Sequence, residues 1–141
     1  MAQEAIKVKG PTVLANSTSG TLAPTIMDSA GKMAIVQSYT LADLSLKVQF
    51  GSAPTAGGTI SVYRRDLSID GANSAPTPTG NYSHTFIGSF KTVADTAVNY
   101  LPLDGVPIST NCELFVKNDT DATMSTDWNL KATPWTYGPA P

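Results

Sequence analysis

Few side chains in this sequence have the chemistry of a catalytic group. The 141 residues include one histidine, His84, and one cysteine, Cys112. His84 alternates with Phe86 in a strand-like pattern, which favours a structural histidine over a general base, and no Ser/His/Asp arrangement can rest on it alone. Cys112 has no second cysteine to pair with and lies at an apolar-facing position. We therefore expect a small buried side chain there and not a nucleophile or metal ligand.

The acidic residues are the second set of candidates for metal binding or catalysis. Asp119, Asp121 and Asp127 lie near one another in the sequence, and oxygen-rich loops can bind calcium. This segment lacks the central glycine and terminal glutamate of an EF-hand loop, so we expect a solvated turn. Glycoside hydrolysis by paired carboxylates would rest on aspartates, because Glu4 and Glu113 are the only glutamates. With no glycine-rich phosphate-binding motif either, we predict no catalytic residue, no metal and no cofactor.

The composition favours an all-β chain. It contains 18 Thr and 13 Ser, and charged residues make up only 14%, below the usual share of about 25%. Surface helices normally carry many charged side chains, whereas Thr-rich outer faces suit sheets. A net charge of −2 predicts no attraction to nucleic acid or anionic membrane. The first ten residues lack a secretion signal and no run reaches the roughly 20 apolar residues of a membrane span, so we expect a soluble product made in a cytosol.

Two alternating runs organise the chain. Residues 44–50 (LSLKVQF) and 59–65 (TISVYRR) place apolar side chains on one face and polar side chains on the other, which is the period of a half-buried strand. The turn-rich segment 51–58 joins them, either as a β-hairpin or as a long connection between sequential strands. At the end of the second run, Arg64 and Arg65 should point to opposite faces, one of them closing the core face and binding carbonyls or carboxylates.

Further strands are predicted over residues 32–40, 82–91, 98–103, 112–117 and 127–133. His84, Phe86 and Phe90 would share one face of their strand, as would Cys112, Leu114 and Val116 of theirs. On the last strand, Trp128, Leu130 and Ala132 would point inward. Gly88 marks a bulge or a close backbone approach, and Pro102 makes its strand an edge strand or shortens it. Residues 13–31 could be loop or strand, and residues 66–81 form a long polar loop. We expect an antiparallel two-sheet sandwich of seven or eight strands, with jelly-roll or Greek-key topology.

Both ends of the chain differ from this domain. We divide the chain into an N-terminal arm (1–12), which could pair with an edge strand, a β-sandwich domain (13–133) and a Pro-rich tail (134–141). The tail is too rich in proline for a regular central strand. Trp135 and Tyr137 would share a face if the tail were extended. Such aromatics dock on their own domain, on a partner surface or against a sugar ring.

The closing half of the chain resembles a known family. The segments YLPLDGVPIS (100–109) and LKATPWTY (130–137), within residues 82–141, are similar to small β-sandwich proteins of tailed bacteriophages, the capsid decoration or cement proteins. The resemblance contains no motif from which individual functional residues can be transferred. It implies a non-enzymatic virion structural protein, made in the host bacterial cytoplasm, which binds the capsid exterior, bridges major capsid protein subunits and stabilises the head.

The resemblance also implies a homo-oligomer, a dimer or a trimer, and the net charge predicts no nucleic-acid or membrane partner. The arms can become ordered on assembly, and weak contacts repeated over many copies become tight. The interface candidates are Ile6, Val8, Phe115, Trp135 and Tyr137. The alternative is a carbohydrate-binding, receptor-recognition β-sandwich on a phage particle, with Trp135, Tyr137, Tyr82 or Phe115 stacking on sugars.

Overall fold

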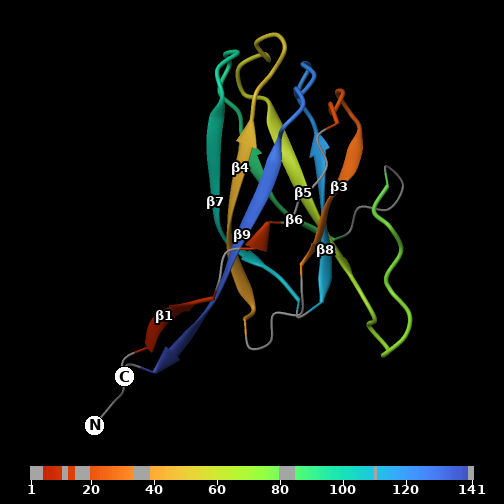
Figure 1. The fold of residues 1–141 in the computed structure, drawn as a ribbon, viewed down its shortest axis with the longest axis vertical. Helices are drawn as coiled ribbons and strands as arrows, with labels where there is room; N and C mark the ends of the chain where they lie inside the picture. The colour runs from red at the N-terminus through yellow and green to blue at the C-terminus, as the bar shows by residue number, and fades with distance from the viewer. Residues whose placement is uncertain are drawn as a thin grey trace.

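Two antiparallel sheets face each other across a common core (Figure 1). The computed structural model describes residues 5–10, 13–14, 20–33, 39–79, 85–109 and 111–139. The strands within these ranges are β1 (Ala5–Lys9), β2 (Val13–Leu14), β3 (Met27–Met33), β4 (Leu41–Val48), β5 (Thr59–Asp66), β6 (Phe86–Lys91), β7 (Asn99–Pro107), β8 (Cys112–Asn118) and β9 (Asn129–Pro139). None of the described segments forms an apolar helix of membrane-spanning length.

The strand order is that of a jelly roll. One sheet has the order β1-β9-β4-β7, with the two-residue β2 also paired to β9, and the other has the order β3-β8-β5-β6. All pairings are antiparallel, and the chain crosses repeatedly from one sheet to the other. The predicted antiparallel two-sheet sandwich is confirmed.

The two organising runs lie in different sheets. Residues 44–48 belong to β4 and residues 59–65 belong to β5, so the hairpin interpretation is wrong and the long connection is correct. The alternation is confirmed, because Leu44, Leu46, Val48 and Phe50 on the first run are buried, as is Ile60 on the second. Each strand turns one face to the core between the sheets.

Arg64 and Arg65 occupy opposite faces of β5, as predicted. Arg64 donates a hydrogen bond to the carbonyl of Pro107 (3.2 Å) at the margin of the core. Arg65 lies 3.2 Å from a carboxylate oxygen of Glu113 and donates to the carbonyl of Ala75 (2.8 Å). These arginines are therefore part of the margin of the sheets.

A bulge explains why one aromatic lies on the unexpected face of β6. Phe90 is opposite Ile60 and is buried, but the register shifts between Gly88 and Phe86. This shift adds one residue to β6, so Phe86 faces outward, where its ring makes an edge contact with Tyr63 (5.7 Å). The prediction that Phe86 and Phe90 share one face is therefore wrong. Gly88 itself allows the expected close approach, because a Cβ there would lie 2.8 Å from the Leu103 side chain.

The strand predicted over residues 32–40 lies earlier in the chain. The structure has β3 at Met27–Met33, within the segment that sequence patterning left open and overlapping the prediction only at its start. Asp28, Ser29 and Gly31 hide the alternation, and the register shifts between Ser29 and Gly31 while Ala30 and Met33 remain buried. Residues 34–38 lie outside the described residues, as do Tyr82 and His84.

Trp128, just before β9, is the largest fully buried side chain among the described residues. Its indole Nε1 donates to the carbonyl of Gly20 (2.9 Å). Leu130 and Ala132, which are predicted to point inward, follow it and are also buried. Leu22, from the N-terminal part of the sequence, is buried as well. The ring therefore links the start of the last strand to a distant loop.

Trp128→Ala should lower the free energy of unfolding by about 3–5 kcal/mol, because it removes a fully buried ring and leaves a cavity. Urea denaturation of the variant and the wild type measures this difference. Trp128→Phe, which keeps most of the ring volume, should lose less. An unchanged midpoint for Trp128→Ala would show that this ring is not part of the core.

Candidate functional site at the paired chain ends

The two ends of the described chain form an antiparallel ribbon that extends away from the sandwich (Figure 1). β4 pairs with β9 only as far as Leu41 opposite Trp135. From Trp135 to Pro139, β9 continues and pairs with β1, from Lys9 back to Ala5. We call residues 5–9 and 135–139 the terminal ribbon.

The expectation that the tail would not continue a regular strand is corrected by this ribbon. β9 passes through Pro134 and ends only at Pro139. Proline lacks an N–H, but its carbonyl remains an acceptor, and that of Pro134 accepts a hydrogen bond from the amide of Gly10 (2.7 Å). The sequence predicts only that the N-terminal arm could pair with an edge strand, and in the structure this strand is β9. The two chain ends therefore form one element.

One carboxylate connects the ribbon to the sandwich. Asp43 lies on the outward face of β4 and accepts hydrogen bonds from three donors on three other strands. These donors are Lys7 Nζ on β1 (2.6 Å), the amide of Gly105 on β7 (3.0 Å) and Trp135 Nε1 on β9 (2.8 Å). We call this group the Asp43 anchor.

The anchor keeps its carboxylate ionised. Partial burial is the largest influence on the pKa of Asp43 and raises it, but the hydrogen bonds from Lys7, Gly105 and Trp135, with the charge of Lys7, outweigh burial. The pKa of Asp43 therefore lies below its ordinary value of 3.8. An ionised acceptor makes stronger hydrogen bonds than a neutral one, so the charge itself stabilises the arrangement.

The Trp135 ring is enclosed by its own chain. The Lys7 ammonium lies 4.4 Å from the ring centroid, in the range of a cation–π contact. The Tyr137 ring meets it edge-on, with centroids 5.0 Å apart and an interplanar angle of 84°. Trp135 and Tyr137 therefore share a face, as predicted, and Trp135 docks on its own domain.

The five interface candidates have different environments. Tyr137 is 65% exposed and Val8 is 38% exposed, both on the terminal ribbon. Trp135 is only 6% exposed and Phe115 only 7%. Phe115 lies opposite Tyr63 and Ser29 in the other sheet, far along the chain from the ribbon. Phe115 is thus covered by its own chain and is not an open contact residue, and the side chain of Ile6 lies outside the described ones.

The single cysteine is a core residue, as predicted. Cys112 is fully buried, with its sulfur 3.9 Å from that of Met33. Burial is the main cause that raises the pKa of its thiol. A raised pKa disfavours the thiolate, which is the reactive form.

The aspartates considered for calcium form bonds within the chain. Asp121 accepts hydrogen bonds from the amide (2.8 Å) and hydroxyl of Thr55, which lower the pKa of its carboxyl. Asp119 accepts from Ser61 and lies 3.2 Å from the Lys117 ammonium. Among the residues that the structure describes, no three His, Cys, Asp or Glu side chains are grouped as metal ligands.

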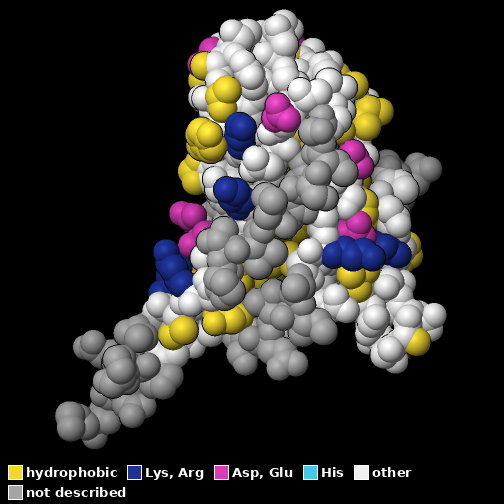
Figure 2. Space-filling view, viewed as in Figure 1, with side chains coloured by type: hydrophobic (Ala, Val, Ile, Leu, Met, Phe, Trp, Pro, Cys, Tyr) yellow, Lys and Arg dark blue, Asp and Glu magenta, His cyan; other side chains and the backbone are white. Residues whose placement is uncertain are grey.

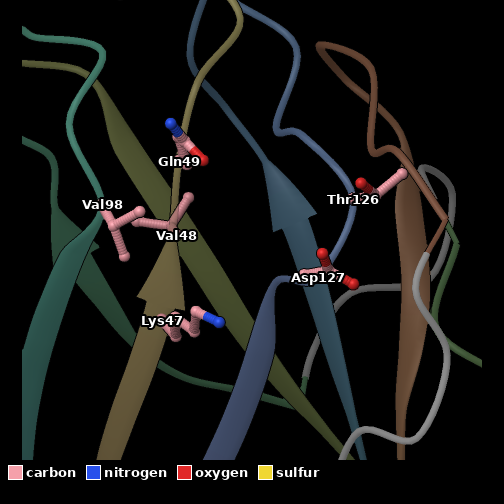
Figure 3. Close-up of a pocket in the computed structure, with 6 residues that line it drawn as sticks. All are labelled: Lys47, Val48, Gln49, Val98, Thr126 and Asp127. Carbon is pink, nitrogen blue, oxygen red and sulfur yellow. The ribbon is translucent and has the colours of Figure 1, made fainter.

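A small pocket opens at the opposite end of β4 from the anchor (Figure 3). Its volume is about 80 Å³, and it is lined by Lys47, Val48, Gln49, Val98, Thr126 and Asp127. Pockets that enclose a small organic ligand usually measure roughly 300–1,000 Å³. Polar groups of Lys47 and Asp127 reach this pocket, but its size suits water and not a substrate.

Comparison with known proteins gives one distant likeness. No protein-family model matches the chain, and no curated protein sequence matches it. Among solved structures, the fold is similar to a carbohydrate-binding module, CBM36, described in complex with calcium and xylotriose. The two share 11% identity with a TM-score of 0.47, and the match covers 94% of this chain and 99% of that one. A likeness at this level carries no argument about function.

The Asp43 anchor was not found from the sequence. The alternation in residues 41–48 places Asp43 on the outward face of β4 together with Ser45 and Lys47, which is a usable signal. Its donors Lys7, Gly105 and Trp135 come from distant parts of the chain, so recognising the anchor requires the strand order. The terminal ribbon and this anchor are the site that the described residues best define.

Asp43→Asn should loosen the ribbon while leaving the sandwich folded. A hydrogen bond to a charged group contributes about 1.5–3 kcal/mol and one to a neutral group about 0.5–1.5 kcal/mol. Amide hydrogen exchange in residues 5–9 and 135–139 should therefore become faster by about tenfold or more. Asp104→Asn, also on the outward side of this sheet at β7, is the matched control. Equal exchange in both variants would contradict the role of the anchor.

The anchor should respond to pH only in acid. Because the pKa of Asp43 is lower in the folded chain, its charge stabilises the ribbon fully above the ordinary value of 3.8. This contribution disappears as the pH falls through the lowered pKa. The indole N–H resonance of Trp135, assigned with Trp135→Phe, should be constant from about pH 7 to 5 and shift only in stronger acid. A midpoint near neutral pH would show that another group controls this bond.

Proposed function

We propose that this protein is a non-enzymatic structural protein that binds the outer surface of a phage capsid and bridges major capsid protein subunits, stabilising the head. The observation that carries the proposal is the terminal ribbon, which combines both chain ends in one projecting element. The capsid as the partner comes from the resemblance of residues 82–141 to decoration proteins. A homo-oligomer, a dimer or a trimer, belongs to the same proposal.

The ribbon has the physical properties of an incomplete contact element. Two isolated strands are marginally stable in water, and this ribbon is held to the sandwich at one end, through Asp43 and the amide of Gly10. β1 is the outermost strand of its sheet, and an open strand edge is a template for contacts with another chain. A partner surface that pairs with the open edge of β1 and covers Tyr137 would complete the element, whereas Val8 lies on the opposite face of the ribbon.

The ribbon projects from the sandwich, which suits a protein that bridges two subunits. A sandwich that rests on one subunit can extend its ribbon toward a neighbouring subunit (Figure 1). Each contact can be weak, because two linked contacts to a repeating surface raise the overall affinity through effective concentration. A covered Trp135 suits this function, since it gives the ribbon a fixed direction before binding.

The carbohydrate-binding alternative has less support in the described residues. Sugar stacking requires an open aromatic face, but Trp135 is covered by Lys7 and Tyr137, and Phe115 is buried beside Tyr63. Tyr82 lies outside the described residues. Of the proposed stacking groups, Tyr137 alone is seen to be exposed, which suits a protein contact equally well.

Co-sedimentation with capsids that lack this protein, from the phage that encodes it, tests the proposed function. The bound amount should saturate at a fixed ratio to the major capsid protein, and decorated heads should resist heat better than bare heads. Folded protein that stays in the supernatant at every concentration would overturn the proposal. A tryptophan fluorescence change with host polysaccharide, in place of capsid binding, would favour the alternative.

Tyr137→Ala should weaken capsid binding by about 30-fold, the effect of losing a contact worth roughly 2 kcal/mol. Ile69→Ala is the comparison variant, because Ile69 is equally exposed, at 65%, but lies in the loop that follows β5. Both variants should unfold at the wild-type temperature. If Ile69→Ala weakens binding and Tyr137→Ala does not, the loop and not the ribbon contacts the capsid.

A further inference from the structure

Tyr100 is an exposed aromatic residue on β7, the strand at one edge of its sheet. Among the described aromatic side chains, those of Phe86, Tyr100 and Tyr137 are more than half exposed, at 53%, 68% and 65%. The Phe86 ring meets Tyr63, and the Tyr137 ring meets Trp135. Tyr100 makes no ring contact with any residue that the structure describes. Its ring is therefore open to a ligand.

Unpaired polar side chains lie beside this ring. The register places Tyr100 beside Lys47 and places Lys47 beside Asn129, and cross-strand partners share a face. Lys47 also lines the small pocket, with Asp127 across from it on the segment that leads into β9 (Figure 3). Within the described ranges, the side chains of Lys47, Asp127 and Asn129 form no hydrogen bond or ion pair. Their donors and acceptors are available to a ligand.

The charges around the pocket are balanced. Lys47 and Lys131 share the outward face of the sheet with Asp104 and Asp127. Figure 2 shows hydrophobic side chains along the β7 edge, with separate basic and acidic side chains beside them. Such a surface has no excess of one charge with which to attract a polyanion or a polycation. It offers ammonium donors and carboxylate acceptors, which suit an uncharged ligand rich in hydroxyl groups.

The pocket has the size of one hydroxyl group. Its volume of about 80 Å³ is too small for a sugar ring. A hydroxyl, like water, donates one hydrogen bond and also accepts, so it can accept from the Lys47 ammonium and donate to the Asp127 carboxylate. Val98 lines the same pocket, is 45% exposed and lies two residues before Tyr100. An apolar strip and a polar pocket therefore adjoin each other.

We propose that Tyr100 and this pocket form a binding site for a neutral polysaccharide with flat rings, such as a β-linked glucan. The apolar C–H face of one ring lies on the Tyr100 ring, and a hydroxyl of the chain replaces water between Lys47 and Asp127. A flat ring suits this site because its C–H groups form one apolar face while its hydroxyls project from its edge. The residues of this site differ from Trp135, Tyr137, Tyr82 and Phe115, the stacking groups considered from the sequence.

This site lies apart from the proposed capsid contact. It is at the opposite end of β4 from the Asp43 anchor and the terminal ribbon, so a protein held through its ribbon keeps the site accessible. Because the site is shallow and covers about one ring, we expect a dissociation constant of about 1 mM for a single copy. Many copies on one particle would bind a polysaccharide surface far more tightly.

A chemical-shift titration of the purified protein with cellohexaose, a neutral hexamer of β-linked glucose, tests the site. Amide resonances of Lys47, Tyr100 and Asn129 should shift and saturate, whereas those of the terminal ribbon should stay unchanged. Tyr100→Ala should weaken binding by about tenfold or more, because it removes the stacking ring. Phe86→Ala, which removes an exposed ring from the other sheet, is the matched control and should keep the wild-type affinity.

Asp127→Asn tests the polar half of the site. Asparagine tolerates the left-handed φ of 70° at this position and keeps the size of the side chain but not its charge. Binding should weaken by about three- to tenfold, since a hydrogen bond to a neutral group is weaker than one to a charged group. Thermal unfolding checks that all three variants fold as the wild type does.

Three results would overturn this inference. They are the absence of saturable shifts up to about 20 mM cellohexaose, well above the expected dissociation constant, equal weakening by Tyr100→Ala and Phe86→Ala, and tighter binding of the acidic polymer polygalacturonate than of cellohexaose. Shifts confined to the terminal ribbon would also contradict it, because they would assign sugar stacking to Tyr137. The titration contains no capsid, so its outcome is independent of the proposed function.

Discussion

The Asp43 carboxylate is the interaction on which the position of the terminal ribbon depends. It accepts hydrogen bonds from Lys7, Gly105 and Trp135, which belong to β1, β7 and β9. Because β4 lies between β9 and β7 in the sheet, one side chain connects the ribbon to the body of the sandwich. The ring of Trp135 then lies between Lys7 and Tyr137, so charge and aromatic packing support the same geometry. A ribbon fixed in this way loses less conformational freedom when it binds.

The jelly roll supplies a rigid platform for this element. Its core is apolar, and the buried polar side chain of Asn118 is fully bonded, donating to the carbonyls of Leu22 and Ala122 and accepting from the amide and hydroxyl of Thr120. Such a satisfied network stiffens the loops at that end. The opposite end carries the ribbon, where exposed Val8 and Tyr137 leave apolar surface unburied. The buried hydrogen-bond network and the proposed contact surface therefore lie at opposite ends of the molecule.

The sequence is informative wherever one face of a strand is buried. Alternation correctly predicts the inward residues of β4, β8 and β9, because burial between two sheets imposes a period of two. It misplaces Phe86, since a bulge adds a residue to β6, and it misses β3, whose Asp28 and Gly31 break the pattern. The ribbon and the Asp43 anchor depend on pairing between residues about 130 positions apart, Lys7 with Tyr137. No local pattern encodes such pairing, which depends on strand order.

Hydrogen exchange of the protein free and bound to capsids measures the central claim most directly. Amides of residues 5–9 and 135–138 should exchange measurably in the free protein and become protected on the capsid. The strands β3 and β6 of the other sheet should keep their free rates. Protection confined to β3 and β6, with an unchanged ribbon, would contradict the claim that the paired chain ends are the contact element.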